Sequence, residues 1–183
     1  MALKVCIDPG HEGGAKGLDP GAVNGSKKEA VAALAIAKKV GFLLKNRGHQ
    51  VKYTRTKDKE LTLQERCDIS NAFDADVFVS IHLNASTNED AEGIETWRYK
   101  NVGERTKKLA DNVQTQLIAM TGCRNRGVKS SESLYVLKHT KASAVLVEAG
   151  FISNAAEAKS LFCERCQNRV AQAIVNGIER AFA

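Results

Sequence analysis

The chain has 183 residues, which is the size of one ordinary domain and long enough to bury a hydrophobic core. Its apolar share of 43% and charged share of 26% are typical of a soluble globular protein, and no stretch approaches the ~18 apolar residues that cross a membrane, so we expect no membrane insertion. The net charge is +6, but Lys and Arg are spread along the chain without the clustered stripe of a nucleic-acid-binding protein, so we expect no nucleic-acid partner.

The first segments predict a strand, a loop and a helix. Residues 3–8 form a short β-type run, and a glycine-rich loop follows as far as Gly25. Ser26 with Glu29 three residues later matches a capping box and predicts the start of a helix that ends at Gly48. Apolar residues recur at helical spacing inside it: Ala33, Ile36, Ala37, Val40 and Leu44.

The middle of the chain continues this alternation. Residues 51–55 predict a second strand, and Thr62 with Glu65 forms another capping box, which predicts a helix toward Phe73. Residues 76–83 are almost continuously apolar, which is typical of a strand covered on both faces. Residues 93–99 predict a further strand.

The last third adds helices and two more strands. Apolar residues at helical spacing predict a helix that Gly122 ends: Leu109, Val113, Leu117 and Met120. Residues 134–137 and 144–147 predict strands, and the chain after Asn154 is expected to be helical to its end. Alternating strands and helices indicate one α/β domain over residues 1–183, with a mixed, mostly parallel sheet of about six strands flanked by helices.

Four candidate site residues converge in this topology. His11 follows the first strand, His82 ends the apolar strand, and Glu148 follows residues 144–147, while Glu29 opens the first helix. Ligand sites of open α/β sheets gather at the carboxyl ends of the strands, so we expect these side chains to be neighbours. Two imidazoles and one carboxylate are a common catalytic zinc set, and a further carboxylate at Glu148 would serve as general base and acid.

Each of these residues also has an ordinary structural explanation. His11 could be a loop residue, His82 a hydrogen-bonded core histidine, and Glu29 part of its capping box. Glu148 is the hardest to explain in this way, because a charge buried after four apolar residues is costly without a partner. It is therefore the strongest single candidate.

The remaining histidines and the cysteines give weaker signals. His49 is expected to point to solvent, and His139 lies in an expected polar loop. Five cysteines leave one unpaired, which suits a reducing compartment better than a disulfide framework; they are Cys6, Cys67, Cys123, Cys163 and Cys166. The opening residues show no signal peptide, so we expect synthesis in the cytoplasm.

Three segments contain the four candidate residues. They are Ile7-Asp8-Pro9-Gly10-His11 with Asp19-Pro20-Gly21-Ala22 and the helix-opening Glu29, Ser80-Ile81-His82-Leu83-Asn84-Ala85, and Leu146-Val147-Glu148-Ala149-Gly150-Phe151-Ile152-Ser153-Asn154. With these segments the chain resembles the zinc-dependent N-acetylmuramoyl-L-alanine amidases of bacteria and phage endolysins. The match runs in one order over nearly the whole chain. The resemblance implies that His11, Glu29 and His82 bind Zn²⁺ and that Glu148 is catalytic.

The implied reaction is hydrolysis of the amide bond between N-acetylmuramic acid and L-alanine in peptidoglycan, at the bacterial cell wall, by an endolysin or an autolysin. No cell-wall-binding domain is visible, and the oligomeric state is not predicted. The chain departs from the family pattern at Glu12, where Gly is usual, at Ala30 and at Ser143. Two alternatives stay open: a different zinc hydrolase of the wall, such as a peptidase or sugar deacetylase, and a catalytically silent wall-binding module.

Overall fold

A six-stranded sheet organises the protein, and the computed structural model describes all of residues 1–183. The strands lie in the order β4-β1-β5-β8-β6-β7, and their bounds are β1 (Lys4–Pro9), β4 (Gln50–Tyr53), β5 (Val77–Asn84), β6 (Ile94–Tyr99), β7 (Asn125–Ser131) and β8 (Ser143–Phe151). Only the β6–β8 pair is antiparallel. The expected α/β class with a mixed, mostly parallel sheet is therefore confirmed.

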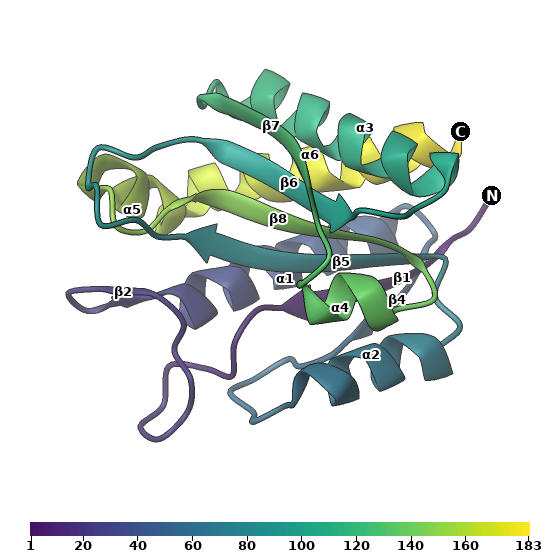
Figure 1. Cartoon of the computed structure of the whole chain (residues 1–183), viewed down its shortest axis with the longest axis horizontal. Coiled ribbons are helices and arrows are strands. Elements are labelled where there is room, and N and C mark those ends of the chain that lie inside the picture. Colours follow the sequence, from purple (N-terminus) through teal and green to yellow (C-terminus); the bar gives the residue numbers. More distant parts are fainter.

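Helices cover both faces of the sheet, but unequally (Figure 1). The larger core lies between the sheet and α1 (Glu29–Asn46), α3 (Glu104–Thr121) and α6 (Glu164–Phe182). On the opposite face, α2 (Leu63–Ala72) and the short α4 (Tyr135–His139) cover a small core over β1, β5 and β8. No residue of β7 is buried. This end of the sheet is therefore open to solvent.

The last turns of the chain form two helices rather than one. α5 (Ala155–Leu161) follows β8, and the helical conformation is interrupted at Phe162 and Cys163 before α6 begins. None of the six helices combines the length and the hydropathy that a membrane crossing requires.

Two expected elements differ in the structure. Residues 134–137, expected as a strand, mostly belong to helix α4, because a short apolar run does not distinguish a strand from a helix turn. Strand β7 was not expected, because its sequence NRGVKSS has a single apolar side chain and hence no hydrophobic alternation. In that edge position the strand needs no buried face.

The start of α1 also differs from the expectation. Lys28 is the N-cap, and its side chain accepts no hydrogen bond from the N–H groups of the helix. Ser26 lies in the turn of an unexpected hairpin of β2 (Val23–Asn24) and β3 (Lys27–Lys28). The capping box at Ser26 was therefore wrong, and Glu29 is the first residue of the helix. The second capping box, of Thr62 and Glu65 at α2, is confirmed.

Candidate metal centre and active site

Three of the four candidate side chains meet at one oxygen atom. The Nε2 atom of His11 lies 3.1 Å from Oε1 of Glu29, and Nδ1 of His82 lies 2.9 Å from the same oxygen. One donor atom from each residue lies within 4.8 Å of the others. The residues come from the loop after β1, the first turn of α1 and the end of β5, so the structure places them together at the rim where the topology predicted them.

Glu29 serves this cluster and not a helix cap. Its side chain is 4% exposed, and its carboxylate also accepts the backbone N–H groups of Ala22 and Leu83, at 2.9 and 3.0 Å. Burial would raise the pKa of Glu29, but hydrogen bonds from His11 and His82 outweigh it and hold the pKa well below its usual range. The carboxylate is thus an anion aimed at two imidazoles.

The backbone that carries His11 is fixed by two buried guanidinium groups. His11 has a φ of 59°, a conformation that few side chains adopt. Arg55 donates to the carbonyl oxygens of Pro9, Gly10 and His11, and Arg66 donates to those of Pro9 and His11. These bonds occupy three successive carbonyl groups and hold the loop in its unusual shape.

Glycine is required just before His11. A Cβ atom at Gly10 would lie 2.4 Å from Cε1 of His82. The backbone of the β1 loop therefore packs directly against the second imidazole, which brings the two histidine rings to a centroid distance of 5.0 Å.

Asp19 orients the His11 ring, a role that the sequence analysis did not assign. Its Oδ2 lies 2.7 Å from Nδ1 of His11, so that Nε2 faces Glu29. A carboxylate on the far nitrogen of a histidine is the usual support of a metal-binding imidazole. Glu12, the departure from the family pattern, accepts the backbone N–H of Asp19 at 3.0 Å and so shapes the same loop.

The protonation of His11 follows from these partners. Burial alone would lower the pKa of His11, but hydrogen bonds and charges from Glu29 and Asp19 raise it to about 9. Without a metal ion, the imidazole is therefore protonated at neutral pH.

Glu148 lies beside the cluster on the neighbouring strand. It is the register partner of His82 across β5 and β8, and of Glu95 across β8 and β6. Its Oε2 is buried and has no hydrogen-bond partner. Burial raises the pKa of Glu148 to about 7; His82 opposes this rise, and the charges of Glu29 and Glu95 add to it. The fourth candidate is thus a carboxyl group able to exchange a proton near neutrality.

The donor set fits a zinc ion in a catalytic arrangement. Two imidazole nitrogens and one carboxylate oxygen match a three-residue zinc site that keeps a coordination position for water or substrate. The unpartnered Oε2 of Glu148, one strand away from His82, is the kind of group that such a site uses.

A cleft of about 490 Å³ opens beside these donors and extends to α2 and α4. Its wall includes the two histidines of the cluster and residues that precede or begin the two helices: His11, His82, Leu61, Leu63, Leu134 and Tyr135. Apolar side chains thus line the part of the cleft away from the two histidines, which suits a substrate larger than an ion.

The other candidate residues lie elsewhere. His49 was expected to face solvent, but its side chain is 7% exposed; its Nδ1 accepts the N–H of Leu3 and its Nε2 contacts Glu179. This histidine joins the chain start to α6. His139 ends α4, where it is exposed and stacks on Tyr135.

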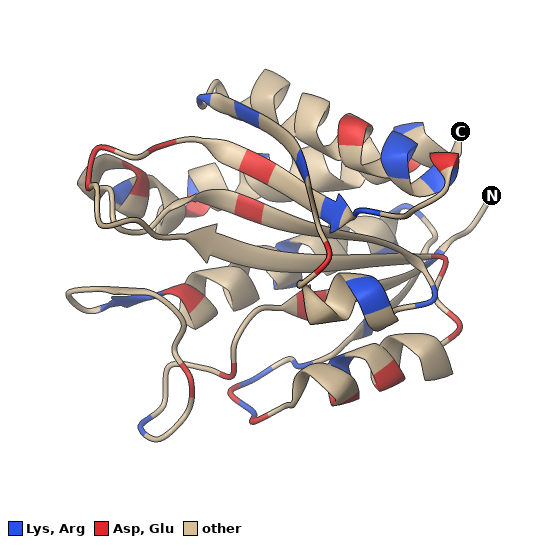
Figure 2. Cartoon of the chain, viewed as in Figure 1, with Lys and Arg blue, Asp and Glu red and all other residues tan.

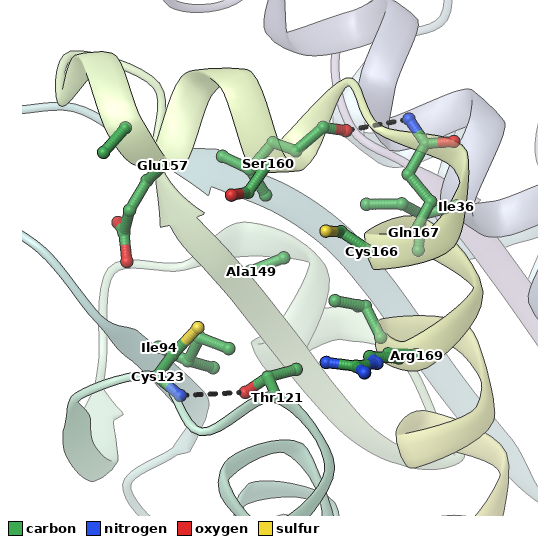
Figure 3. A pocket seen from close by; sticks show the side chains of 13 residues that line it. Ile36, Ile94, Thr121, Cys123, Ala149, Glu157, Ser160, Cys166, Gln167 and Arg169 are labelled. Atoms are coloured by element: carbon green, nitrogen blue, oxygen red, sulfur yellow. Dashed lines mark hydrogen bonds between the residues drawn. The ribbon is translucent and has the colours of Figure 1, made fainter.

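A second, mostly apolar cavity of about 200 Å³ lies on the other face of the sheet (Figure 3). It lies beside α5 and α6, and Ala149 of β8 faces it, so the neighbouring Glu148 points to the opposite face. Cys123 and Cys166 lie in its wall, and all five cysteines are free thiols. This cavity shares no residue with the metal cluster.

Comparisons with known proteins agree with the geometry. The family model described as N-acetylmuramoyl-L-alanine amidase (Amidase_3) matches residues 5–180. YqiI of Bacillus subtilis is 40% identical over 96% of this chain and 82% of its own length, and the amidase LytC of B. subtilis is 37% identical over 94% of this chain and 34% of its own. The chain thus spans about a third of LytC.

Among solved structures, the catalytic domain of CwlV, an N-acetylmuramoyl-L-alanine amidase from Bacillus (Paenibacillus) polymyxa var. colistinus, is 38% identical. It superposes with a TM-score of 0.88 over 97% of this chain and 96% of that chain.

Proposed function

Because the chain belongs to the N-acetylmuramoyl-L-alanine amidase family, we propose that it is a zinc-dependent hydrolase of the amide bond between N-acetylmuramic acid and L-alanine in peptidoglycan. The observation that carries this proposal is the meeting of His11 and His82 at one oxygen of Glu29, with Glu148 beside them on the next strand. A wall-binding module without catalysis has no need for a carboxyl group with a buried, unpartnered oxygen at that place.

His11, Glu29 and His82 would hold the zinc ion. When bound, zinc supplies the Lewis acidity that polarises a carbonyl group and makes water a better nucleophile at neutral pH. Asp19 keeps Nε2 of His11 turned toward the cluster, and the N–H groups of Ala22 and Leu83 keep the Glu29 carboxylate in place. The ligands are thus oriented by the chain itself.

Glu148 would act as the general base and then as the general acid. It takes a proton from the attacking water and returns it to the nitrogen of L-alanine as the amide bond breaks. Burial raises the pKa of Glu148, to about 7 in the metal-free chain, and a raised pKa suits both steps, since the same group must accept and release a proton. The site of action is the bacterial cell wall, where the protein would serve as an autolysin or an endolysin.

Mass spectrometry of digested peptidoglycan tests the reaction. The zinc-loaded chain should release stem peptides with a free L-alanine amine and leave the glycan intact. New reducing ends, cleaved cross-links or released acetate would each identify a different hydrolase. Binding to the wall without any product would identify the silent module.

Chelation and variants test the assigned roles. Chelation should abolish the reaction and added zinc should restore it. Glu148→Gln should keep its zinc content and lose turnover, whereas His82→Ala should lose zinc. Glu164→Gln, a matched change at an 83% exposed side chain of α6, should retain both. Lysis that persists through thorough chelation would refute zinc dependence, and near-normal turnover by Glu148→Gln would remove Glu148 from its role.

A further inference from the structure

A row of functional groups crosses four neighbouring strands on one face of the sheet. His82 of β5 is the register partner of Glu148 on β8, and Glu148 is the partner of Glu95 on β6. Arg126 and Lys129 of β7 then contact Glu95. Figure 2 shows acidic positions side by side on β6 and β8, with basic positions on β7 next to them. The row leads from the metal donors toward the open end of the sheet.

Glu95 is a buried carboxylate with four side-chain donors. Its Oε1 accepts Nδ2 of Asn84 at 3.1 Å and Nε1 of Trp97 at 3.0 Å. Its Oε2 accepts Nε of Arg126 at 2.7 Å and Nζ of Lys129 at 2.6 Å. The Glu95 side chain is 3% exposed. One carboxylate thus holds two cations, and the group as a whole carries one excess positive charge.

Glu95 holds both cations in place, and both remain accessible to solvent. Their side chains are 29% exposed for Arg126 and 35% exposed for Lys129. The Arg126 guanidinium lies 4.8 Å from the ring centroid of Phe151, and the Lys129 ammonium lies 5.3 Å from that of Trp97. Neutralising the buried Glu95 requires only one cation, so the second leaves a site where an external anion can bind.

The distance from Glu148 suits a peptide substrate. Neighbouring strands lie ~4.8 Å apart, so β6 and β7 lie about 5 and 10 Å from β8. An extended peptide advances ~3.4 Å per residue, so a carboxylate on the second residue of a stem peptide lies about 7 Å from the amide nitrogen at Glu148. That carboxylate comes within reach of the long side chains of Arg126 and Lys129.

We propose that Arg126 and Lys129, held by Glu95, form a subsite for the free carboxylate of the stem-peptide residue that follows L-alanine. This inference rests on the proposed function. It also gives the substrate a direction: the stem peptide runs from Glu148 across β6 toward β7, and the sugar side of the scissile bond occupies the cleft at α2 and α4.

Two matched synthetic substrates, both blocked at the γ-carboxyl group as the methylamide, test the subsite: N-acetylmuramoyl-L-alanyl-D-isoglutamate, with a free α-carboxylate on the second residue, and the D-isoglutamine analogue, with a carboxamide there. The zinc-loaded full chain should cleave the carboxylate substrate with a kcat/KM about tenfold higher, as expected for charge-assisted hydrogen bonds. Arg126→Gln and Lys129→Gln should each remove most of this preference through KM, with little effect on the carboxamide substrate. Lys107→Gln, on α3 away from the row, should keep the preference.

Zinc content and thermal unfolding of each variant report whether the site and the fold persist. Equal cleavage of both substrates by the unchanged protein would overturn the subsite. Variants that lower kcat/KM equally for both substrates would also overturn it, because that pattern indicates a merely structural role.

Calorimetric binding of the free product peptides separates the subsite from the proposed function. It uses the γ-methylamides of L-alanyl-D-isoglutamate and of its α-carboxamide, and needs no turnover. Carboxylate-dependent binding that Arg126→Gln abolishes, in a protein that cleaves neither substrate, would support the subsite and refute the amidase function. Equal cleavage of both substrates would support the amidase function and refute the subsite. If the protein neither binds the peptides nor cleaves the substrates, both proposals are refuted.

Discussion

Replacing Glu148 by Gln should stabilise the zinc-free protein, and the gain should grow as pH rises. The reason is the buried Oε2 of Glu148, which no hydrogen bond compensates once the carboxyl group is ionised. Burial therefore raises the pKa of Glu148 from its ordinary 4.5 to about 7 in the folded chain. Gln has nearly the same shape and carries no charge at any pH.

The size of the effect follows from the linkage between protonation and folding. The folded state holds the Glu148 proton more tightly than the unfolded state, so stability falls as pH rises from about 4.5 to about 7 and then stays level. Since each unit of pKa difference corresponds to about 1.4 kcal/mol, the ionised side chain costs the folded protein up to about 3 kcal/mol. The cost should be close to zero at pH ~4.

Urea denaturation in the presence of a chelator measures this difference. We expect Glu148→Gln to match the unchanged protein near pH ~4.5 and to exceed its free energy of unfolding by about 3 kcal/mol near pH ~8.5. His11 and Glu29 titrate in both proteins, so their contributions cancel to first order. A stability difference that does not change between these pH values would refute the reasoning, and so would a variant that is the less stable of the two at high pH.

Three further predictions concern the candidate metal site. Asp19→Asn should lower zinc affinity about tenfold in a chelator competition while leaving unfolding free energy nearly unchanged, because it weakens the support of His11. Gly21→Ala would place a Cβ atom 2.5 Å from Cδ2 of His11 and should therefore lower zinc affinity. Gly25 has a similar positive φ but open space around it, so Gly25→Ala should lower only the free energy of unfolding, by about 1 kcal/mol. Equal zinc affinities of these two variants would contradict the packing argument. Because the pKa of His11 is about 9, zinc binding at pH 7 should release about one proton. The binding heat measured by calorimetry should then depend on the ionisation enthalpy of the buffer. A binding heat that is the same in all buffers would contradict this proton release.

The strongly patterned elements could be predicted from the sequence. The apolar run of β5, the helical stripe of α3 and the Thr62 capping box each rest on local chemistry, and all three are present in the structure. β7 and α4 could not be predicted, because NRGVKSS has no alternation and residues 134–137 suit either a strand or a helix. Ser26 shows that a local motif can match by chance where a tight hairpin turn precedes a helix.

The proximity of His11, Glu29, His82 and Glu148 could be predicted because strand ends share one rim of a parallel sheet. The parts that support these residues could not. Arg55 reaches the carbonyl groups of residues 9–11 from a loop more than forty positions away. Glu95 becomes the neighbour of Glu148 only through the antiparallel register of β6 and β8. Such contacts depend on strand order and register, which single-sequence patterns do not carry.

Strand β7 also bears on whether separate molecules of the protein pair with one another. It is one of the two edges of the sheet, so one side of its backbone is free to pair with a strand of another copy. Arg126 and Lys129, together with the irregular register beside β6, make that edge a poor template for such pairing. Replacing both cations with apolar residues should therefore promote self-association as well as change peptide preference. Polar replacements should change peptide preference without promoting self-association.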